Sequence, residues 1–276
     1  MTTATVATFP MSDGYACHYR HYPPQGERRG VVVYLHGIQS HGGWYTRSCE
    51  YLAAAGWEVL FLDRRGSGLN QRDRGDAPSY RRLVDDVAEL VSTRPVRPLL
   101  VAVSWGGKLA VALEVLYPGL IAGMALLTPG LCPRVRPPFG QRLGIALARL
   151  VSPRRLFPIP LDDPELFTAT PSGQAFIRDD PLALRRATAR LLVSSAFLDR
   201  ALATAPEEVK APALLMLAGH DRIIDNDRTR AYFARFASAD KQVIEYPEAH
   251  HTLELEPDPT PTFADLAGWL ERHGPA

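Results

Sequence analysis

The chain lacks an excess of charge of either sign, and it has almost no lysine. Its 276 residues carry 31 basic and 30 acidic side chains, which gives a formal net charge of +1. This balance excludes a protein that holds nucleic acid or an anionic membrane through bulk charge. Only Lys108, Lys210 and Lys241 are lysines, and all other basic residues are arginines.

Cysteine is also scarce, and long apolar runs are missing. Cys17, Cys49 and Cys132 are too few and too scattered for a disulfide framework, and their spacing fits no metal site. The longest nearly apolar run, 120–127, is far shorter than a membrane span. The first ten residues contain no basic residue and no apolar run of the kind found in signal peptides. We therefore expect a soluble cytoplasmic protein without a metal or other cofactor.

Short apolar runs predict the strands of a parallel sheet. The runs are continuous rather than alternating, which is typical of strands buried on both faces. Helical patterns lie between them, so we expect an α/β fold, a mostly parallel sheet with helices on both faces. Residues 15–22 precede this alternation and can pair back antiparallel without a crossover helix. The predicted strands are 30–35, 58–62, 99–103, 124–127, 213–217 and 242–246, with helices at 48–55, 83–91 and 109–117 between them.

The alternation stops in the segment 129–206, which we expect to be a helical cap inserted into the sheet. Nine prolines fall within 43 residues there, and proline at this density excludes central strands. The segment holds 11 arginines against six acidic residues. Residues 1–128 and 207–276 are then the two parts of one core domain. Helical patterns remain in the cap at 139–151 and 182–198, with Arg185, Arg186 and Arg190 expected on a solvated face of the second.

The sharpest motif spans residues 102–106 and centres on Ser104. It lies between a predicted buried strand and a predicted helix, the context of a nucleophile elbow. The tight turn leaves room only for small residues two positions before and after the serine. Gly106 satisfies this need, and Ala102 stands where glycine is usual. A serine that merely caps the following helix is the alternative interpretation.

A serine hydroxyl becomes a nucleophile only when a base removes its proton and an acid orients the base. Asp221 directly follows the strand at 213–217 and is the predicted acid. Asp225 and Asp227 come later, where a helix begins, and are better explained as cap and first-turn acids. His250 and His251 both follow the strand at 242–246, and spacing alone does not choose between them.

Acyl transfer also needs two backbone N–H donors that hold the oxyanion of the tetrahedral intermediate. Trp105, the residue after the serine, is the first predicted donor. Ile38 is the second, because it follows a strand end at which Gly37 lets the backbone approach closely. His41 belongs to the same loop and is a candidate substrate contact, although packing explains it equally well.

These motifs resemble a known family. Residues 36–45 resemble the HGxxxHxxxY loop of monoacylglycerol lipases and bacterial lysophospholipase-like serine hydrolases of the serine aminopeptidase S33 type, and 63–68 resemble their D-x-R-G-x-G turn. Ser104, Asp221 and the segment 249–251 align with the three triad segments of that family, and the alignment favours His251 as the catalytic histidine. The resemblance covers 30–128 and 207–270, and it implies the α/β-hydrolase fold.

The resemblance also implies an activity. It points to hydrolysis of carboxylic esters, either short- to medium-chain acyl esters or monoacylglycerol, through an acyl-enzyme formed on Ser104. A small ester or lipid is then the expected partner, and the sequence does not determine the oligomeric state. Lysophospholipid, amide or peptide, and carbon–carbon bond hydrolysis use the same triad and stay open as alternatives. A binding module without activity is the competing class, but such proteins usually lose a triad member.

An apolar stripe at helical spacing marks the first cap helix. Under the resemblance, this stripe lines an acyl-chain pocket beneath a mobile lid. Packing of the cap onto the core is an equally good explanation. The candidate substrate contacts on the stripe are Phe139, Leu143 and Leu147, with Ala146 and Leu150 beside them.

Overall fold

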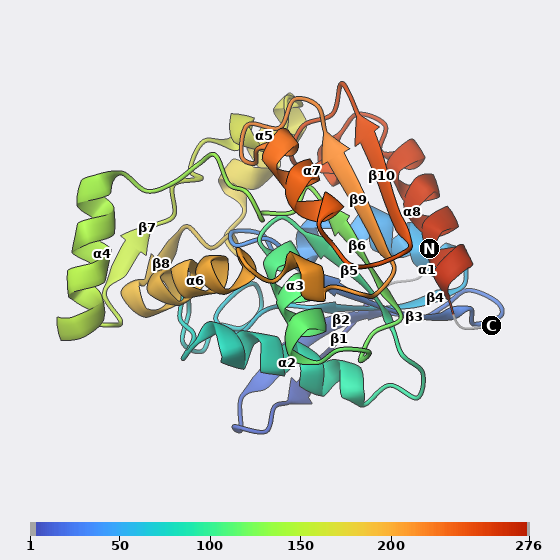
Figure 1. The fold of residues 1–276 in the computed structure, drawn as a ribbon, viewed down its shortest axis with the longest axis horizontal. Coiled ribbons are helices and arrows are strands. Elements are labelled where there is room, and N and C mark those ends of the chain that lie inside the picture. The colour runs from blue at the N-terminus through green and yellow to red at the C-terminus, as the bar shows by residue number, and fades with distance from the viewer. Residues whose placement is uncertain (1–3, 275–276) are drawn as a thin grey trace.

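The structure is a computed structural model that describes residues 4–274, and it is organised around an eight-stranded sheet (Figure 1). The last six strands along the chain that belong to this sheet run parallel to one another. The first two strands form antiparallel pairs at one edge. The predicted α/β class is confirmed. In spatial order the strands are β1 (Thr5–Pro10), β2 (Ala16–Tyr22), β4 (Trp57–Leu62), β3 (Gly30–Leu35), β5 (Leu99–Val103), β6 (Gly123–Leu127), β9 (Ala213–Ala218) and β10 (Lys241–Tyr246).

Helices cover both faces of the sheet because the chain crosses it in two directions. From β3 it passes through α1 (Thr46–Ala54) to β4, and from there through α2 (Tyr80–Ser92) back across β3 to β5. Right-handed crossovers place these two helices on opposite faces. α3 (Gly106–Leu116) packs beside α2, and α8 (Thr260–His273) packs beside α1 (Figure 1). Within residues 4–274, none of the helices has both the length and the apolar character that a membrane span requires.

The reversal of strand order positions the loops that follow β3 and β5 next to each other. Parallel strands all end at the same edge of a sheet, and a crevice opens where neighbouring connections leave in opposite directions. The loop of Gly37 follows β3, and Ser104 follows β5, on the adjacent strand. The topology therefore brings two of the predicted motifs together.

Burial follows the predicted pattern except in β10. The residues of β3, β5, β6 and β9 are all buried, as their continuous apolar runs indicate. In β10 burial alternates instead, and Val243 is 42% exposed. The prediction of burial on both faces is wrong for this strand, because it is the last in the sheet and one of its faces points to solvent.

The insert, residues 129–206, connects β6 to β9 and projects from the end of the sheet (Figure 1). The predicted helix 139–151 is confirmed as α4. The predicted helix 182–198 is wrong in its first part, because β8 pairs there with β7 and a helix begins only at Ala189. Thr188 sets this start, since its side chain accepts the N–H of Leu191 and caps the helix. The elements of the insert are α4 (Phe139–Val151), β7 (Leu156–Pro158), α5 (Pro171–Asp179), β8 (Arg186–Thr188) and α6 (Ala189–Leu202).

Arg190 anchors α6 to the core rather than facing solvent. Its guanidinium forms an ion pair with Asp76, which is 3% exposed. The hydroxyl of Thr188 donates to the same carboxylate at 2.7 Å. Arg186, also expected on this helix, lies in β8 and is exposed. The solvated helix face predicted for these arginines is therefore absent from the described part of the insert.

Candidate active site

Ser104 occupies a strained turn between β5 and α3. Its φ angle of 51° lies in the left-handed region, which residues other than glycine rarely adopt and which marks functional sites. A side chain at Gly106 would place its Cβ 2.7 Å from the carbonyl oxygens of Leu35 and His36, so only glycine fits there. Ala102 is fully buried within β5. The side chain of Ser104 does not cap α3, which leaves its hydroxyl available for chemistry.

Three side chains from three different strand ends meet in a hydrogen-bonded chain. The Oγ of Ser104 lies 2.9 Å from Nε2 of His251, and Nδ1 of the same ring lies 2.7 Å from Oδ2 of Asp221. Because the carboxylate accepts the Nδ1 proton, the lone pair of Nε2 faces the serine hydroxyl. This arrangement can take a proton from Ser104 and return it to a leaving group.

Asp221 is held as a buried acceptor. Its Oδ1 accepts the N–H groups of Ile223 and Ile224 at 2.8 and 2.9 Å, which leaves Oδ2 for the histidine. Asp225 instead caps α7 (Asn226–Ala234), accepting the N–H of Arg228 at 3.0 Å, as predicted. Asp225 therefore caps a helix, whereas Asp221 binds His251.

The structure resolves the choice between the two neighbouring histidines. The ring of His250 turns to Glu256, with Nδ1 3.1 Å from Oε1, and its backbone N–H donates to the same oxygen at 2.7 Å. The carbonyl of His251 accepts a hydrogen bond of 2.8 Å from Thr128. Of these two rings, that of His251 is the one within hydrogen-bonding distance of Ser104 and Asp221.

The loop after β3 lies against the elbow. A Cβ at Gly37 would be 3.3 Å from the Cβ of Ser104, so the backbone approaches the serine closely. The N–H groups of Ile38 and Trp105 donate to no other group within residues 4–274. Backbone donors in such a position are ordinarily paired, and two free ones beside a nucleophile suit the binding of an anionic oxygen.

The insert covers the site through contacts that the sequence did not reveal. The ring of Phe167 meets that of His251 edge to face, with 5.9 Å between the centroids, and its carbonyl accepts the N–H of Thr252 at 2.9 Å. On the other side, the indole N–H of Trp105 donates to Ser195 at 2.9 Å. Phe167 and Ser195 belong to no motif or periodic pattern in the sequence, so sequence reasoning had no signal for them.

His41 joins the loop after β3 to the insert. Its Nε2 donates to Asp180 at 2.9 Å, and its Nδ1 accepts the N–H of Gly43 at 3.0 Å. Asp180 also accepts the indole N–H of Trp44 at 2.6 Å, and these contacts lower the pKa of its carboxyl to about 2, against the opposing effect of burial. His41 has no ring nitrogen left for a substrate, so the packing interpretation replaces the predicted contact.

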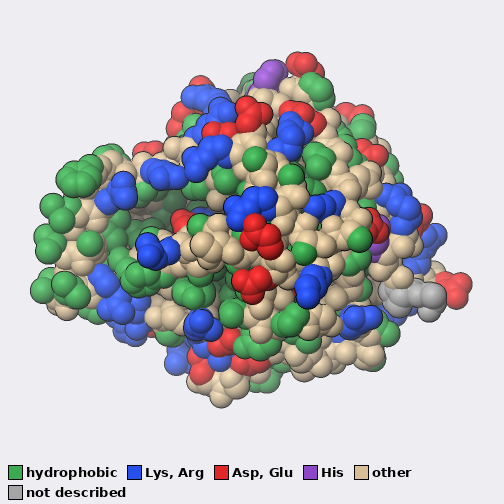
Figure 2. Space-filling view, viewed as in Figure 1, with side chains coloured by type: hydrophobic (Ala, Val, Ile, Leu, Met, Phe, Trp, Pro, Cys, Tyr) green, Lys and Arg blue, Asp and Glu red, His purple; other side chains and the backbone are tan. Residues whose placement is uncertain are grey.

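The apolar stripe of α4 faces solvent. Phe139, Leu143 and Leu147 are 78%, 52% and 57% exposed, and apolar side chains gather along this edge of the insert in Figure 2. The buried residues of α4 are Ile145 and Ala148, which pack towards α6. Both predictions for the stripe, an enclosed acyl pocket and packing on the core, are therefore wrong, because the opposite side of the helix makes the contact.

Glu254 is a buried carboxyl that the sequence reasoning did not identify. It follows His251 by three residues, and its Oε1 accepts the N–H of Ser48 in the first turn of α1 at 3.0 Å. Burial raises the pKa of Glu254 to about 7, although hydrogen bonds from Ser48 and the charge of Arg47 oppose this shift. The group therefore ionises in the neutral range within the folded protein.

We expect Glu254 to make the protein less stable as pH rises. Between pH 4.5 and 7 the folded protein keeps a proton that the unfolded chain has released, so the free energy of unfolding falls through this window. The loss amounts to about 3 kcal/mol. Urea unfolding at several pH values measures this loss. In Glu254→Gln, the free energy of unfolding is expected to lose this part of its dependence on pH. The exposed Glu248→Gln on the same loop is the matched control, and equal slopes in wild type and Glu254→Gln contradict the prediction.

Comparisons with known proteins identify the family. The family model described as serine aminopeptidase, S33 matches residues 26–258. A monoacylglycerol lipase of Mycolicibacterium smegmatis is 28% identical over 286 residues, with 99% of each chain covered. A human monoglyceride lipase is 26% identical, with 95% of this chain and 88% of the human protein covered.

Solved structures show the same fold. The monoacylglycerol lipase of Paleococcus ferrophilus superposes with a TM-score of 0.86 at 24% identity, covering 93% of this chain and 99% of the other. A soluble variant of monoglyceride lipase from Saccharomyces cerevisiae, in complex with a substrate analog, superposes with a TM-score of 0.86 at 21% identity. The superposition covers 100% of this chain and 96% of the yeast chain. No group of three or more potential metal ligands gathers within residues 4–274.

Proposed function

Because the chain belongs to the serine aminopeptidase S33 family of α/β-hydrolases, we propose that it is a serine hydrolase that cleaves carboxylic esters, with short- to medium-chain acyl esters or monoacylglycerol as substrates. One observation carries the proposal. Ser104, His251 and Asp221 form a continuous hydrogen-bonded chain with distances of 2.9 and 2.7 Å at the end of the sheet. The names of the Mycolicibacterium and human relatives support acylglycerols as the substrate class.

The reaction follows from the position of each group. His251 accepts the proton of Ser104 through Nε2 while the serine Oγ attacks the acyl carbon, and Asp221 stabilises the imidazolium that forms. The N–H groups of Ile38 and Trp105 hold the oxyanion of the tetrahedral intermediate. His251 then protonates the departing alcohol. A water molecule activated by the same histidine releases the acid from the acyl-enzyme and regenerates Ser104.

The exposed face of α4 supports a lipid substrate. Leu150 and Val151 are 81% and 84% exposed and extend the stripe of Phe139, Leu143 and Leu147. Large apolar side chains that gather on a surface mark a contact with another apolar surface. Arg142 and Arg149 lie exposed on the same helix, so this face suits an aggregate that holds the lipid substrate and carries negative charge.

A substrate panel tests the proposal. We expect the wild-type protein to react with a fluorophosphonate probe and to hydrolyse aryl esters of increasing acyl length and monoacylglycerol. Lysophospholipid and an aryl amide in the same panel test the alternatives, and faster cleavage of either one than of every neutral ester overturns the assignment. With monoacylglycerol in anionic vesicles, Leu150→Ser/Val151→Ser is expected to lose most of the turnover while keeping that of a soluble aryl ester.

A further inference from the structure

Arg64 is a buried cation beside the proposed active site. It follows β4, is 5% exposed, and binds two backbone carbonyls rather than a carboxylate. Its Nη1 donates to the carbonyl of Gly37 at 3.1 Å, and its Nη2 donates to the carbonyl of Ile38 at 3.0 Å. The guanidinium carbon lies 4.8 Å from the centre of the Trp105 ring. One side chain therefore contacts both segments that supply the proposed oxyanion donors.

This arrangement is costly in the resting protein. A buried charge without a directly bound carboxylate is unfavourable, and within residues 4–274 Arg64 forms no ion pair. Its Nε has no hydrogen-bond partner there. The neighbouring Asp63 binds Arg20 and the N–H groups of Gly42 and Leu69 instead. Burial lowers the pKa of Arg64 to about 10, although the charge of Asp63 opposes this shift, so the side chain keeps its charge at neutral pH.

The carbonyl of Gly37 connects Arg64 to the oxyanion. It belongs to the same peptide group as the N–H of Ile38, so a donor on its oxygen fixes the direction of that N–H and polarises it. His36 donates to the same oxygen through Nδ1 at 2.7 Å, because its Nε2 accepts the N–H of Arg64 at 2.8 Å. Two donors thus act on one peptide group, and one of them is charged.

We propose that Arg64 is a positioning residue of the oxyanion hole, which holds the Gly37–Ile38 peptide and the Trp105 ring in place and offsets the negative charge that develops on the substrate oxygen. The inference rests on the proposed function, since the oxyanion exists only during acyl transfer. In the resting protein no carboxylate of the described residues is bound to the guanidinium, so the negative charge that develops in the transition state adds a favourable interaction, and this is how preorganised charge lowers a barrier.

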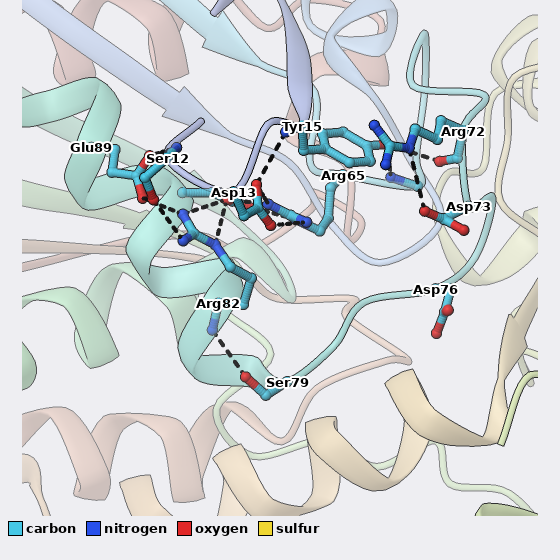
Figure 3. A network of polar contacts seen from close by, with 12 residues as sticks. Ser12, Asp13, Tyr15, Arg65, Arg72, Asp73, Asp76, Ser79, Arg82 and Glu89 are labelled. Carbon is cyan, nitrogen blue, oxygen red and sulfur yellow. Dashed lines mark hydrogen bonds and ion pairs between the residues drawn. The ribbon is translucent and has the colours of Figure 1, made fainter. Parts of the chain in front are cut away.

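The next residue provides a matched control. Arg65 is equally buried at 5% exposure, but its guanidinium binds carboxylates, with Nη1 donating to Asp13 at 2.9 Å and Nε donating to Asp86 at 2.6 Å. Figure 3 shows this network, in which Arg65 points towards Asp13 beside the ring of Tyr15. Arg65→Met removes the same side chain from the same turn without touching the carbonyls of the loop after β3.

The experiment compares Arg64→Met, Arg64→Lys and Arg65→Met with wild type in three measurements. These are kcat/KM for a soluble aryl ester, Ki for a trifluoromethyl ketone that forms an oxyanion on Ser104, and Ki for a non-hydrolysable ether analogue of monoacylglycerol. We expect Arg64→Met to lower kcat/KM about 100-fold and to raise the Ki of the ketone by a similar factor. The Ki of the ether analogue is expected to stay unchanged. Arg64→Lys keeps the positive charge but has one nitrogen instead of the two that bind the carbonyls, so its kcat/KM is expected to fall about tenfold. Arg65→Met lowers the thermal midpoint but leaves the three constants of the folded enzyme close to wild type.

Three outcomes overturn the proposal. They are an unchanged kcat/KM in Arg64→Met, a ketone Ki that does not follow kcat/KM, and an equal loss of ether binding. If Arg64→Met does not fold, Arg64→Lys decides by the same criteria. Wild-type protein that neither hydrolyses an ester nor reacts with the ketone refutes the proposed function itself, and this result is seen before any variant is compared.

Discussion

Replacement of Ser104 by alanine is expected to lower kcat/KM for a soluble aryl ester by about 10⁵- to 10⁶-fold, as loss of a nucleophile does in other triad hydrolases. The reason is that, among the described residues, the Oγ of Ser104 is the hydroxyl bonded to Nε2 of His251, at 2.9 Å. Without the hydroxyl no acyl-enzyme forms, and only the oxyanion hole and substrate binding remain. Initial rates and labelling by a fluorophosphonate probe measure the effect.

The control for this variant is another buried serine. Ser67 is fully buried and its hydroxyl has no partner within the described residues, so Ser67→Ala removes a similar group at little cost. It is expected to keep its activity and its labelling. Equal labelling of Ser104→Ala and wild type, with both folded, rules out Ser104 as the nucleophile.

Replacement of His251 by alanine has the second largest expected effect, a loss of about 10⁵- to 10⁶-fold in kcat. Within the described part of the chain, its imidazole is the side chain that bridges Ser104 to Asp221, at 2.9 and 2.7 Å. Since the serine and its base act as a unit, the double variant Ser104→Ala/His251→Ala is expected to be no slower than either single variant. Steady-state rates for the three variants with the same aryl ester check both statements.

The adjacent histidine supplies a sharp control. His250 binds Glu256 at 3.1 Å and contacts neither Ser104 nor Asp221, so His250→Ala is expected to keep a kcat close to wild type. The two substitutions remove the same ring from neighbouring positions of one loop. Similar losses in both variants contradict the assignment of the base to His251.

Some features of the site follow from local pattern. The elbow at Ser104 was predictable because a buried strand, a small residue, a serine and a glycine in sequence are typical of this turn, although the need for Gly106 comes from the carbonyls of Leu35 and His36 at the end of β3. Asp221 was predictable because the carboxyl ends of parallel strands share one edge of the sheet, whereas Asp225 stands at a helix start. In both cases the signal that made the prediction possible lies within a few residues of the side chain.

Other features depend on which surfaces meet. The stripe on α4 revealed that one side of the helix is apolar, but not that Ile145 and Ala148 on the other side would be the ones to pack towards α6. The start of α6 depends on the pairing of β8 with β7, thirty residues earlier in the chain. A periodic pattern identifies an apolar face and carries no information about its partner.

The clearest case is the pair Arg64 and Arg65. From the sequence alone, they are two adjacent arginines in a turn after a strand, and the family resemblance does not separate their roles. Their partners come from segments far along the chain, carbonyls of Gly37 and Ile38 for one and carboxylates of Asp13 and Asp86 for the other. Local patterns thus indicated the sheet, the elbow and the position of Asp221. Long-range packing decided which histidine turns towards Ser104 and which arginine binds the loop after β3, because a side chain's electrostatic role depends on the groups that the fold brings to it.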